Sequence, residues 1–375
     1  MIRRVITTVV AACALGLAAC GSGAVVEPKA EAAALPADFF GMVAPELLPA
    51  KDGDLNQALD AQAKAGVELI RQPFRWEEIE PKPGKFNFTL HDRLVGRAAG
   101  AGITIMPIVF GVPKREASKK KRGAKVTATT TMPPKSNARF AKYAAKLVQR
   151  YGTNGTYWSE HPTAAKRPIT AWQVWNEPNL PPYWGGKPDA KAYAKLLKTT
   201  GAAIKKADPA ARVLTGGMPE SKIGVPLVKY VKQLAKAAGP TGYDVLAVHP
   251  YSKTAQGVLA GAASAQRAAT VGGKKPPVWI TECGWATGKL GSDFTVSEAK
   301  QAKLVSDLVR LSAQRAEALQ LQGVVYYAWR DVPPYPGGKD FWGLHTGLVK
   351  KNNTVKPSLT AYAAATAKAR ATPAS

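Results

Sequence analysis

The sequence has 375 residues and carries 52 basic against 26 acidic side chains, a formal net charge of +26 at pH 7. This length is enough for one large domain or two small ones, and a hydrophobic share of 46% is ordinary for a globular protein with a buried core. Besides Cys13 and Cys20 near the N-terminus the chain has only Cys283, so no intramolecular disulfide is expected in the mature protein.

The N-terminal segment has the pattern of an export signal. Arg3 and Arg4 precede an apolar stretch over Val5–Leu17, and the segment ends in Leu17-Ala18-Ala19-Cys20. These features predict a signal peptide, whose apolar part is too short to remain as a membrane-spanning helix. The Leu-Ala-Ala-Cys ending resembles a bacterial lipobox, which makes Cys20 the lipidated first residue of the mature chain. The alternative is an ordinary signal cleaved nearby, with Cys20 incidental.

The chain therefore divides into a signal over 1–19, a flexible tether over 20–37 and one folded domain over 38–375. The tether is rich in Ala, Gly, Pro and Glu and shows no periodicity. We predict an exported lipoprotein on the outer face of the bacterial cell membrane. It would be held there by a lipid anchor and not by a spanning helix.

From Phe39 onward, short apolar runs alternate with amphipathic stretches of helical length. Eight runs are continuously apolar, as expected for strands that are buried on both faces. They are Phe39–Ala44, Glu68–Phe74, Thr104–Phe110, Thr170–Trp175, Val213–Gly217, Val245–Val248, Val278–Thr281 and Val324–Trp329.

Helix signals lie between these runs. The apolar residues of 136–151 repeat at the spacing of one helix face. Asp189 is placed to cap a helix that Pro209 ends, and Thr295 with Glu298 forms a capping box. Eight strands alternating with helices predict the α/β class and a single (β/α)₈ TIM barrel. A doubly wound open sheet is the structural alternative, but the Gly-rich turn that usually follows its first strand is absent.

The longest insertion follows the third strand, over 111–135, and is strongly basic. We predict a mobile loop there, on the face where the strands end. Such a loop is suited to recruiting an acidic polysaccharide; the alternative is a solvated basic loop without a partner. Its basic residues include Lys114, Arg115, Lys119, Lys120, Lys121, Arg122 and Lys125.

Two carboxylates lie at strand ends, where the chemistry of such barrels takes place. The fourth strand leads into Asn176-Glu177-Pro178 and the seventh into Thr281-Glu282. Glycoside hydrolysis requires two carboxyl groups that flank the scissile bond. One is protonated to assist the leaving oxygen, and the other is ionised to attack the anomeric carbon or to activate water. The alternative is that each Glu is a structural ion-pair partner.

These two strand ends resemble clan A of the glycoside hydrolases. The resemblance implies that Glu177 is the general acid/base and Glu282 the nucleophile of a retaining, double-displacement hydrolysis of O-glycosidic bonds in a poly- or oligosaccharide. The run over 174–180, followed by Tyr183-Trp184, looks most like family 39. Family 5 is not excluded, although it often has a His at the end of the third strand, which here is Val109-Phe110-Gly111.

The same resemblance assigns further residues to substrate binding. Asn176 would contact the sugar 2-hydroxyl, and Arg71 would keep the nucleophile ionised. In His249-Pro250-Tyr251, the Tyr251 hydroxyl would hydrogen-bond the nucleophile. Arg75 is a rival for the role of Arg71, and His249 is alternatively an ordinary core histidine.

Tryptophans near the strand ends are candidates for stacking on sugars. By the resemblance, Trp329 forms the floor under the reacting sugar. Trp184, Trp285 and Trp342 lie in loops near strand ends, where either stacking or ordinary packing is open. Cys283 is expected to be a buried small residue that points away from the site.

No metal and no organic cofactor are implied, because the four histidines are scattered without metal-ligand spacing and no phosphate-binding loop is present. The positive charge favours anionic partners, which for an exported protein means an acidic glycan more readily than nucleic acid. The alternative function is a catalytically inactive glycan-binding barrel on the cell surface. A nucleic-acid binder or adhesin rests on composition alone and predicts binding that collapses with salt.

Overall fold

The computed structural model describes residues 34–118, 120–122, 125–127, 129–335 and 337–371. The predicted signal peptide, Cys20 and most of the predicted tether lie outside the described residues. Within those ranges, no helix is both long and apolar enough to cross a membrane.

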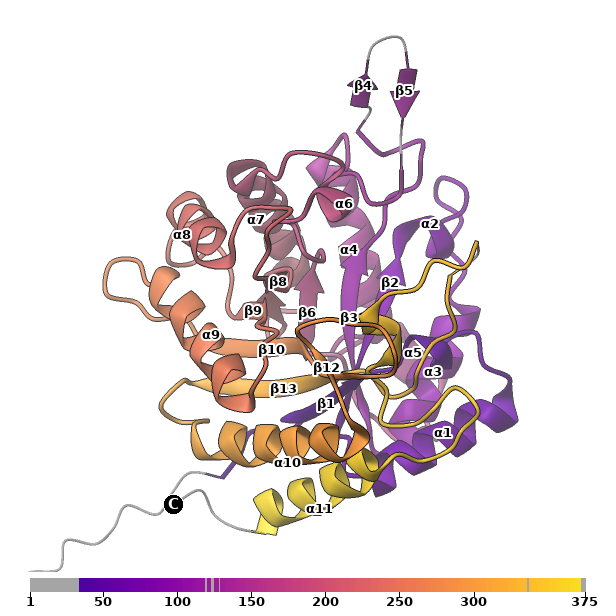
Figure 1. Cartoon of the computed structure of the whole chain (residues 1–375). Helices are drawn as coiled ribbons and strands as arrows, with labels where there is room; N and C mark the ends of the chain where they lie inside the picture. The colour runs from indigo at the N-terminus through magenta and orange to yellow at the C-terminus, as the bar shows by residue number, and fades with distance from the viewer. Residues whose placement is uncertain (1–33, 119, 123–124, 128, 336, 372–375) are drawn as a thin grey trace, which may run out of the picture.

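Nine parallel strands form one sheet that curls into a barrel (Figure 1). The strands are β1 (Phe40–Val43), β2 (Leu69–Arg75), β3 (Thr104–Phe110), β6 (Ala171–Val174), β7 (Arg212–Leu214), β8 (Met218–Pro219), β9 (Leu246–His249), β10 (Val278–Cys283) and β13 (Leu321–Tyr327). Their order is β7-β6-β3-β2-β1-β13-β10-β9-β8. A bridge between Leu214 and Val245 joins β7 to the residue before β9. The predicted TIM barrel is therefore confirmed.

Each predicted strand position holds a strand; most bounds differ by one or two residues, and two predicted runs differ more. The fifth predicted run, Val213–Gly217, contains only the last two residues of β7, and β8 begins directly after it; these two strands lie at the two ends of the sheet order. The last strand begins at Leu321 instead of Val324 and ends at Tyr327 instead of Trp329. Polar Gln322 and the following glycine interrupt the apolar run, which hides the start of this strand in the sequence.

Helices cover the outer face of the sheet (Figure 1). The long ones are α1 (Asp52–Lys64), α3 (Thr89–Gly100), α4 (Asn137–Tyr151), α7 (Ala190–Ala207), α8 (Leu227–Ala238), α9 (Ala255–Ala268), α10 (Glu298–Gln314) and α11 (Pro357–Ala371), and the short ones are α2 (Trp76–Ile79), α5 (Thr156–Glu160) and α6 (Pro181–Trp184). Asp189 caps α7 as predicted, because its side chain accepts the backbone N–H groups of Lys191 and Ala192.

The predicted cap of α10 is wrong. Ser297 caps this helix by accepting the backbone N–H of Lys300. Thr295 instead lies in the short strand β12 (Thr295–Val296), which pairs with β11 (Ala286–Thr287), and its hydroxyl donates to the carbonyl of Leu290. Ser297 is also a favoured N-cap residue, and the pairing of Thr295 in β12 with β11 leaves it as the cap.

Apolar side chains fill the barrel on both sides of its wall. One cluster lies inside the barrel and draws on nearly every strand position: Val43, Leu69, Met106, Ala171, Leu214, Val245, Ala247, Trp279, Val325 and Ala328. A larger core lies between strands and helices, because successive strand residues point to opposite faces. Each fully buried Val, Leu or Ile contributes roughly 1.5–3 kcal/mol. Since the interior is packed, a reaction site has room only at the rim.

Part of the basic insertion folds as an antiparallel hairpin. β4 (Lys120–Arg122) pairs with β5 (Lys125–Thr127), a pairing that the sequence did not predict. The hairpin projects from the barrel end opposite to the described chain ends (Figure 1). At that other end, Arg370 of α11 donates to the carbonyls of Leu35 and Pro36, in the last part of the predicted tether.

Candidate active site

The end of β6 brings Glu177 to the rim through an unusual turn. Trp175 and Glu177 have φ values of 75° and 44°, in the left-handed region that residues with side chains seldom adopt. The backbone N–H of Glu177 donates to the carbonyl of Gly217 at 3.0 Å, which ties the turn to the segment between β7 and β8. Positive φ values at residues with side chains are often found at functional sites, where the surrounding structure holds a side chain in place.

Glu282 lies in β10, one residue before the strand ends, and both of its oxygens are held. Arg71 Nη1 lies 2.6 Å from Oε1, and the Tyr251 hydroxyl donates to Oε2 at 2.9 Å. The next residue, Cys283, points into the core between strands and helices, and burial raises the pKa of its thiol. Strand alternation thus separates the carboxylate from the buried cysteine, as predicted.

Arg71 joins the two strand ends in one buried network. Its Nη2 donates to Asn176 Oδ1 at 2.8 Å, and its Nε donates to Gln173 Oε1 at 2.6 Å. The predicted rival, Arg75, forms its ion pairs with Glu77 and its neighbour Glu78 instead. Gln173 was missed from the sequence. Its signal was a polar residue inside the apolar run of β6, two positions before Trp175.

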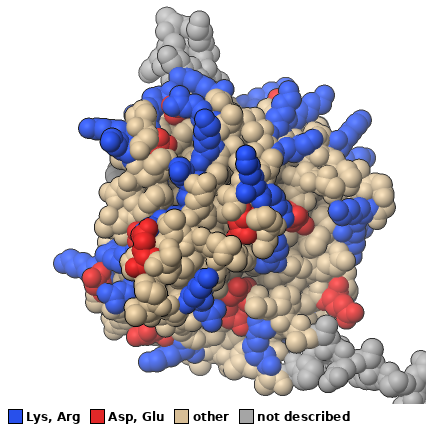
Figure 2. Space-filling view, turned by 180° about the vertical axis from the view of Figure 1, so that it is seen from behind, with Lys and Arg blue, Asp and Glu red and all other residues tan. Residues whose placement is uncertain are grey.

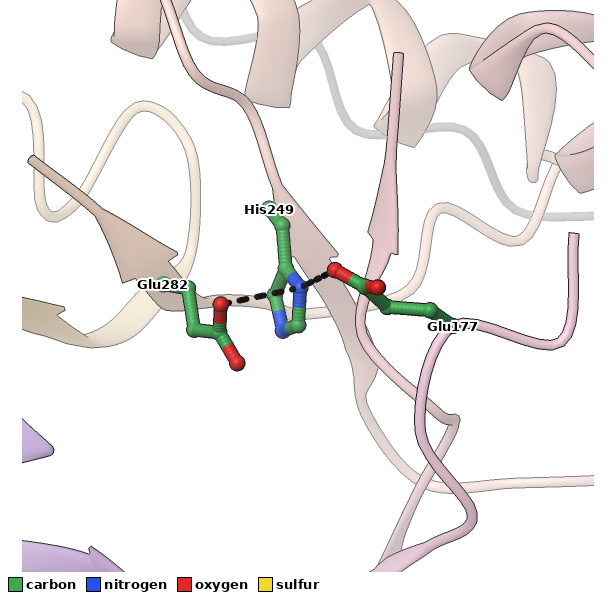
Figure 3. Close-up of side chains that lie close together, drawn as sticks. All are labelled: Glu177, His249 and Glu282. Atoms are coloured by element: carbon green, nitrogen blue, oxygen red, sulfur yellow. Dashed lines mark hydrogen bonds and ion pairs between the residues drawn. The ribbon is translucent and has the colours of Figure 1, made fainter. Parts of the chain in front are cut away.

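His249 lies between the two carboxyl groups (Figure 3). Its Nδ1 is 2.9 Å from Glu177 Oε1 and 3.6 Å from Glu282 Oε2. A Cβ at Gly217 would lie 1.9 Å from His249 Nε2, so only glycine permits this approach. Burial, with a smaller effect of the Arg71 charge, holds the pKa of His249 well below its usual range. The imidazole is therefore neutral at neutral pH.

The two carboxyl groups lie in contrasting environments. Burial, and then the charge of Glu282, raises the pKa of Glu177 well above its usual range, while Arg71 acts in the opposite direction. Glu282 is bound directly to the guanidinium of Arg71. One carboxyl group is thus buried with a raised pKa and the other is paired with an arginine, a difference in environment that suits two carboxyl groups with different roles at one site.

The spacing of the pair limits the chemistry. One ligand atom from each of Glu177, His249 and Glu282 lies within 4.8 Å of the others. This is close to the separation of about 5–5.5 Å in retaining glycosidases and well short of the roughly 6.5–9.5 Å that makes room for an attacking water in inverting ones.

The same three side chains are of types that bind metal ions. Their atoms are already engaged, however. Arg71 and Tyr251 hold the two oxygens of Glu282, and His249 Nδ1 faces Glu177. A cation at Glu282 would also lie against the positive charge of Arg71. The arrangement fits proton transfer better than metal binding.

Three of the tryptophans predicted to contact the sugar are buried, which favours the alternative of ordinary packing. Trp184 packs edge-on against Trp175 and Tyr193. Trp285 is fully buried, and its indole N–H donates to the carbonyl of Ser252. Trp329 is 2% exposed and belongs to the core between strands and helices. Their loops fold back on the barrel, which the sequence does not reveal.

Other aromatic side chains border the carboxyl pair. Tyr327 ends β13 and packs against the cluster inside the barrel. Burial, and then the charge of Glu282, raises the pKa of Tyr327, and burial followed by Glu177 does the same for Tyr183. The half-buried Trp342 lies 5.1 Å from Tyr251 between ring centroids. Sequence reasoning missed both Tyr327 and Tyr183.

We expect Tyr327→Ala to impair catalysis and Trp329→Ala to impair stability. Loss of Tyr327 should lower kcat/KM on a small glycoside by about 10–100-fold, at a cost of about 1–3 kcal/mol in substrate contact. Trp329→Ala should reduce the free energy of unfolding by about 3–5 kcal/mol and leave kcat/KM of the folded enzyme near wild type. Steady-state kinetics and urea denaturation of both variants test this. A larger kinetic loss for Trp329→Ala would reverse the assignment.

We expect Gln173→Glu to lower kcat/KM by about 10–100-fold, since a hydrogen bond to a charged group is worth about 1.5–3 kcal/mol. A carboxylate beside Arg71 would compete with Glu282 for the guanidinium, so Arg71 would hold Glu282 less firmly for attack. Gln322 is the matched control, because it accepts from Arg212 away from the site. Steady-state kinetics of both variants test this. An unchanged kcat/KM in Gln173→Glu, or an equal loss in Gln322→Glu, would contradict the role of this network.

Comparison with known proteins is consistent with this geometry. Residues 130–331 match a family described as the glycosyl hydrolase catalytic core. Similar solved structures include a family 39 glycoside hydrolase from Bacteroides cellulosilyticus WH2, with 22% identity and a TM-score of 0.62 over 88% of this chain and 64% of that one. A GH39 beta-xylosidase from Caulobacter crescentus has 20% identity and a TM-score of 0.60 over 89% and 72%. GH5_18 from Streptomyces cattleya, in complex with GlcNAc, has 16% identity and a TM-score of 0.65 over 91% and 82%.

Proposed function

Because the chain belongs to the glycosyl hydrolase catalytic core family, we propose that it is a retaining glycosidase in which Glu177 is the general acid/base and Glu282 the nucleophile. One observation carries the proposal. Two carboxyl groups face each other around His249 at short range, and only one of them is paired with an arginine. Short separation with divided protonation supports double displacement.

In the first step, a Glu282 oxygen attacks the anomeric carbon while Glu177 gives its proton to the departing oxygen. The glycosidic C–O bond breaks, the leaving group departs as an alcohol, and the sugar is left as an ester on Glu282. Arg71 and Tyr251 fix the two oxygens of Glu282 for this attack. Because Asn176 Oδ1 accepts from Arg71, its amide nitrogen is left to donate to the sugar 2-hydroxyl.

In the second step, Glu177 is a carboxylate and takes a proton from an incoming water. The water oxygen attacks the anomeric carbon and displaces Glu282, so the sugar leaves with its original anomeric configuration. His249 stays neutral and keeps one contact with Glu177 through the cycle. The second step therefore restores the protonated acid and the paired carboxylate.

The charges favour an uncharged sugar at the reacting position. Inside the site, the positive charge of Arg71 is matched by Glu282. The excess of basic side chains is on the surface, where Figure 2 shows Lys and Arg spread across one whole face. We propose that this surface charge attracts an anionic polymer at longer range, while the hydrolysed bond belongs to a neutral unit. Xylosides are a first choice of substrate, since one relative of this fold is named a beta-xylosidase.

The fold suits a membrane-anchored enzyme. Leu35 and Pro36 are bound at the barrel end opposite to the rim that carries Glu177 and Glu282. We propose that a lipid on Cys20 anchors that end, so that the active site faces away from the membrane. Cys20→Ala should move the protein from the membrane fraction to the soluble fraction with its activity intact. Unchanged membrane association would contradict lipidation at this residue.

Release of reducing sugar from a panel of neutral and acidic polysaccharides and aryl glycosides tests the function. We expect hydrolysis of at least one neutral glycoside, and proton NMR should show that the first product has the configuration of the substrate. Inversion would contradict the double displacement. Glycan binding without any hydrolysis across the panel would favour the inactive glycan-binding barrel.

A further inference from the structure

A cavity opens on the flank of the barrel, away from the carboxyl pair. It measures about 510 Å³ and lies between α1, the short helix η1 (Pro45–Leu47) that follows β1, and the chain that leads from β13 into α11. Glu46, Asp54, Gln57, Trp329, Arg330 and Val355 are among its lining residues, and none of the side chains around Glu177 and Glu282 is. This volume is in the range of small-molecule sites.

Three polar atoms of two charged residues beside this cavity are buried without a partner. Both carboxylate oxygens of Glu46 and the Nε of the half-buried Arg330 are inaccessible to solvent and have no hydrogen-bond partner in another residue of the described part of the chain. Burial raises the pKa of Glu46 to about 7, against smaller opposite effects of its own backbone N–H and of the Arg330 charge. Buried polar atoms are nearly always satisfied, and unsatisfied ones carry a desolvation cost of about 1–3 kcal/mol each. A ligand that supplies the missing hydrogen bonds would remove this cost.

The opposite charges restrict the chemistry of the ligand. A simple cation would be opposed by Arg330, and a simple anion by Glu46 and Asp54. A hydroxyl group avoids both penalties, because it donates to a carboxylate and accepts from a guanidinium N–H. The exposed Gln57 and Asp54 extend the polar side toward solvent, while Val355, 55% exposed, provides an aliphatic contact for C–H groups.

We propose that this flank cavity is a second carbohydrate-binding site, which holds one or two sugar units of a glycan outside the catalytic centre. The choice of a sugar rests on the proposed function, since an enzyme that cleaves a polymer meets the same polymer along its flank. Occupancy would raise the local concentration of polymer at the rim without altering the chemistry there.

The test is isothermal titration of the full chain, in the Glu282→Gln background, with xylo-, cello- and manno-oligosaccharides of four to six sugars. We expect two binding events, of which Glu46→Ala removes one or weakens it at least tenfold. Arg330→Met, a second variant on the other side of the cavity, should do the same. Asp60→Ala, an exposed position on α1 outside the lining, is the matched control and should leave both events. Thermal denaturation of each variant verifies the fold.

The outcomes separate this proposal from the proposed function. A single event that neither Glu46→Ala nor Arg330→Met alters, or no binding at all, would overturn the second site. If the wild-type protein hydrolyses nothing and shows a single binding event that both variants abolish, the second site would be supported and the glycosidase refuted. Glu46-dependent binding of glycine, with no sugar bound, would show a site for a zwitterion and overturn the carbohydrate assignment. Glu46→Ala should keep wild-type kcat/KM on an aryl glycoside.

Discussion

Glu282→Gln should reduce turnover by on the order of 10⁴-fold or more, the scale of loss when a catalytic nucleophile is removed. The amide is nearly isosteric with the carboxylate, so the barrel should remain folded. It cannot form the glycosyl ester, however, and it loses the ion pair with Arg71 at 2.6 Å. Initial rates on the best substrate of the panel, with circular dichroism as the control of folding, measure the effect.

Glu220→Gln is the matched control for this variant. Glu220 follows β8 at the barrel rim and is exposed. The same chemical change there should leave kcat/KM at the wild-type level. Residual activity of Glu282→Gln within tenfold of wild type would exclude Glu282 as the nucleophile.

Glu177→Ala should lose more activity on a substrate whose leaving group has a high pKa than on one whose leaving group has a low pKa. General acid catalysis typically contributes about 10²–10⁴-fold, so a natural oligosaccharide should show a loss of that size. A dinitrophenyl glycoside needs little protonation and should form the glycosyl ester at close to the wild-type rate. A Brønsted plot of kcat/KM against leaving-group pKa, steep for the variant and shallow for wild type, is the measurement.

The pH profile gives an independent test of the same residue. Glu177 must be protonated at the start of the cycle, and burial followed by the charge of Glu282 raises its pKa well above the usual range. Wild-type kcat/KM should therefore persist to a pH where an exposed glutamate is ionised, and fall above the raised pKa. In Glu177→Ala this basic limb should disappear. A basic limb that survives, together with equal losses on both kinds of substrate, would contradict the acid role.

The fold could be predicted from the sequence because parallel strands are buried on both faces and therefore appear as apolar runs. Runs such as Thr104–Phe110 are apolar throughout and coincide with β3. The strand ends then share one rim, so Glu177, Glu282, Arg71 and Tyr251 had to come near one another once the barrel was inferred. The structure brings these four together with the predicted contacts of Arg71 and Tyr251 to Glu282. It adds contacts of Arg71 to Gln173 and Asn176 that the sequence did not specify.

The sequence did not reveal which aromatic side chains border the carboxyl pair. Whether an aromatic side chain faces the sugar or the core depends on where a strand ends, and one or two residues decide it. β13 ends at Tyr327, so this residue faces the site while Trp329 packs under the helices. For Trp184 and Trp285 the path of the loop decides, and loop residues carry no periodicity that reveals which face is covered.

The sequence predicted only part of the hydrogen-bond network around Arg71. The arginine was found through a resemblance, but its partner Gln173 carries no motif and acts only through its place in β6. Similarly, Glu46 and Arg330 are far apart in the sequence, and only the fold brings both of them to one cavity. Side chains that meet through tertiary packing leave no local pattern.

The most direct test of the account is to trap the glycosyl–enzyme ester. A dinitrophenyl 2-deoxy-2-fluoroglycoside of the sugar that the enzyme releases should inactivate it and add one fluoroglycosyl mass, and peptide mapping should place that mass on Glu282. Inactivation with the label on another residue would contradict the assignment of the nucleophile. Turnover of the natural substrate with inverted product and no label at all would contradict the double displacement itself.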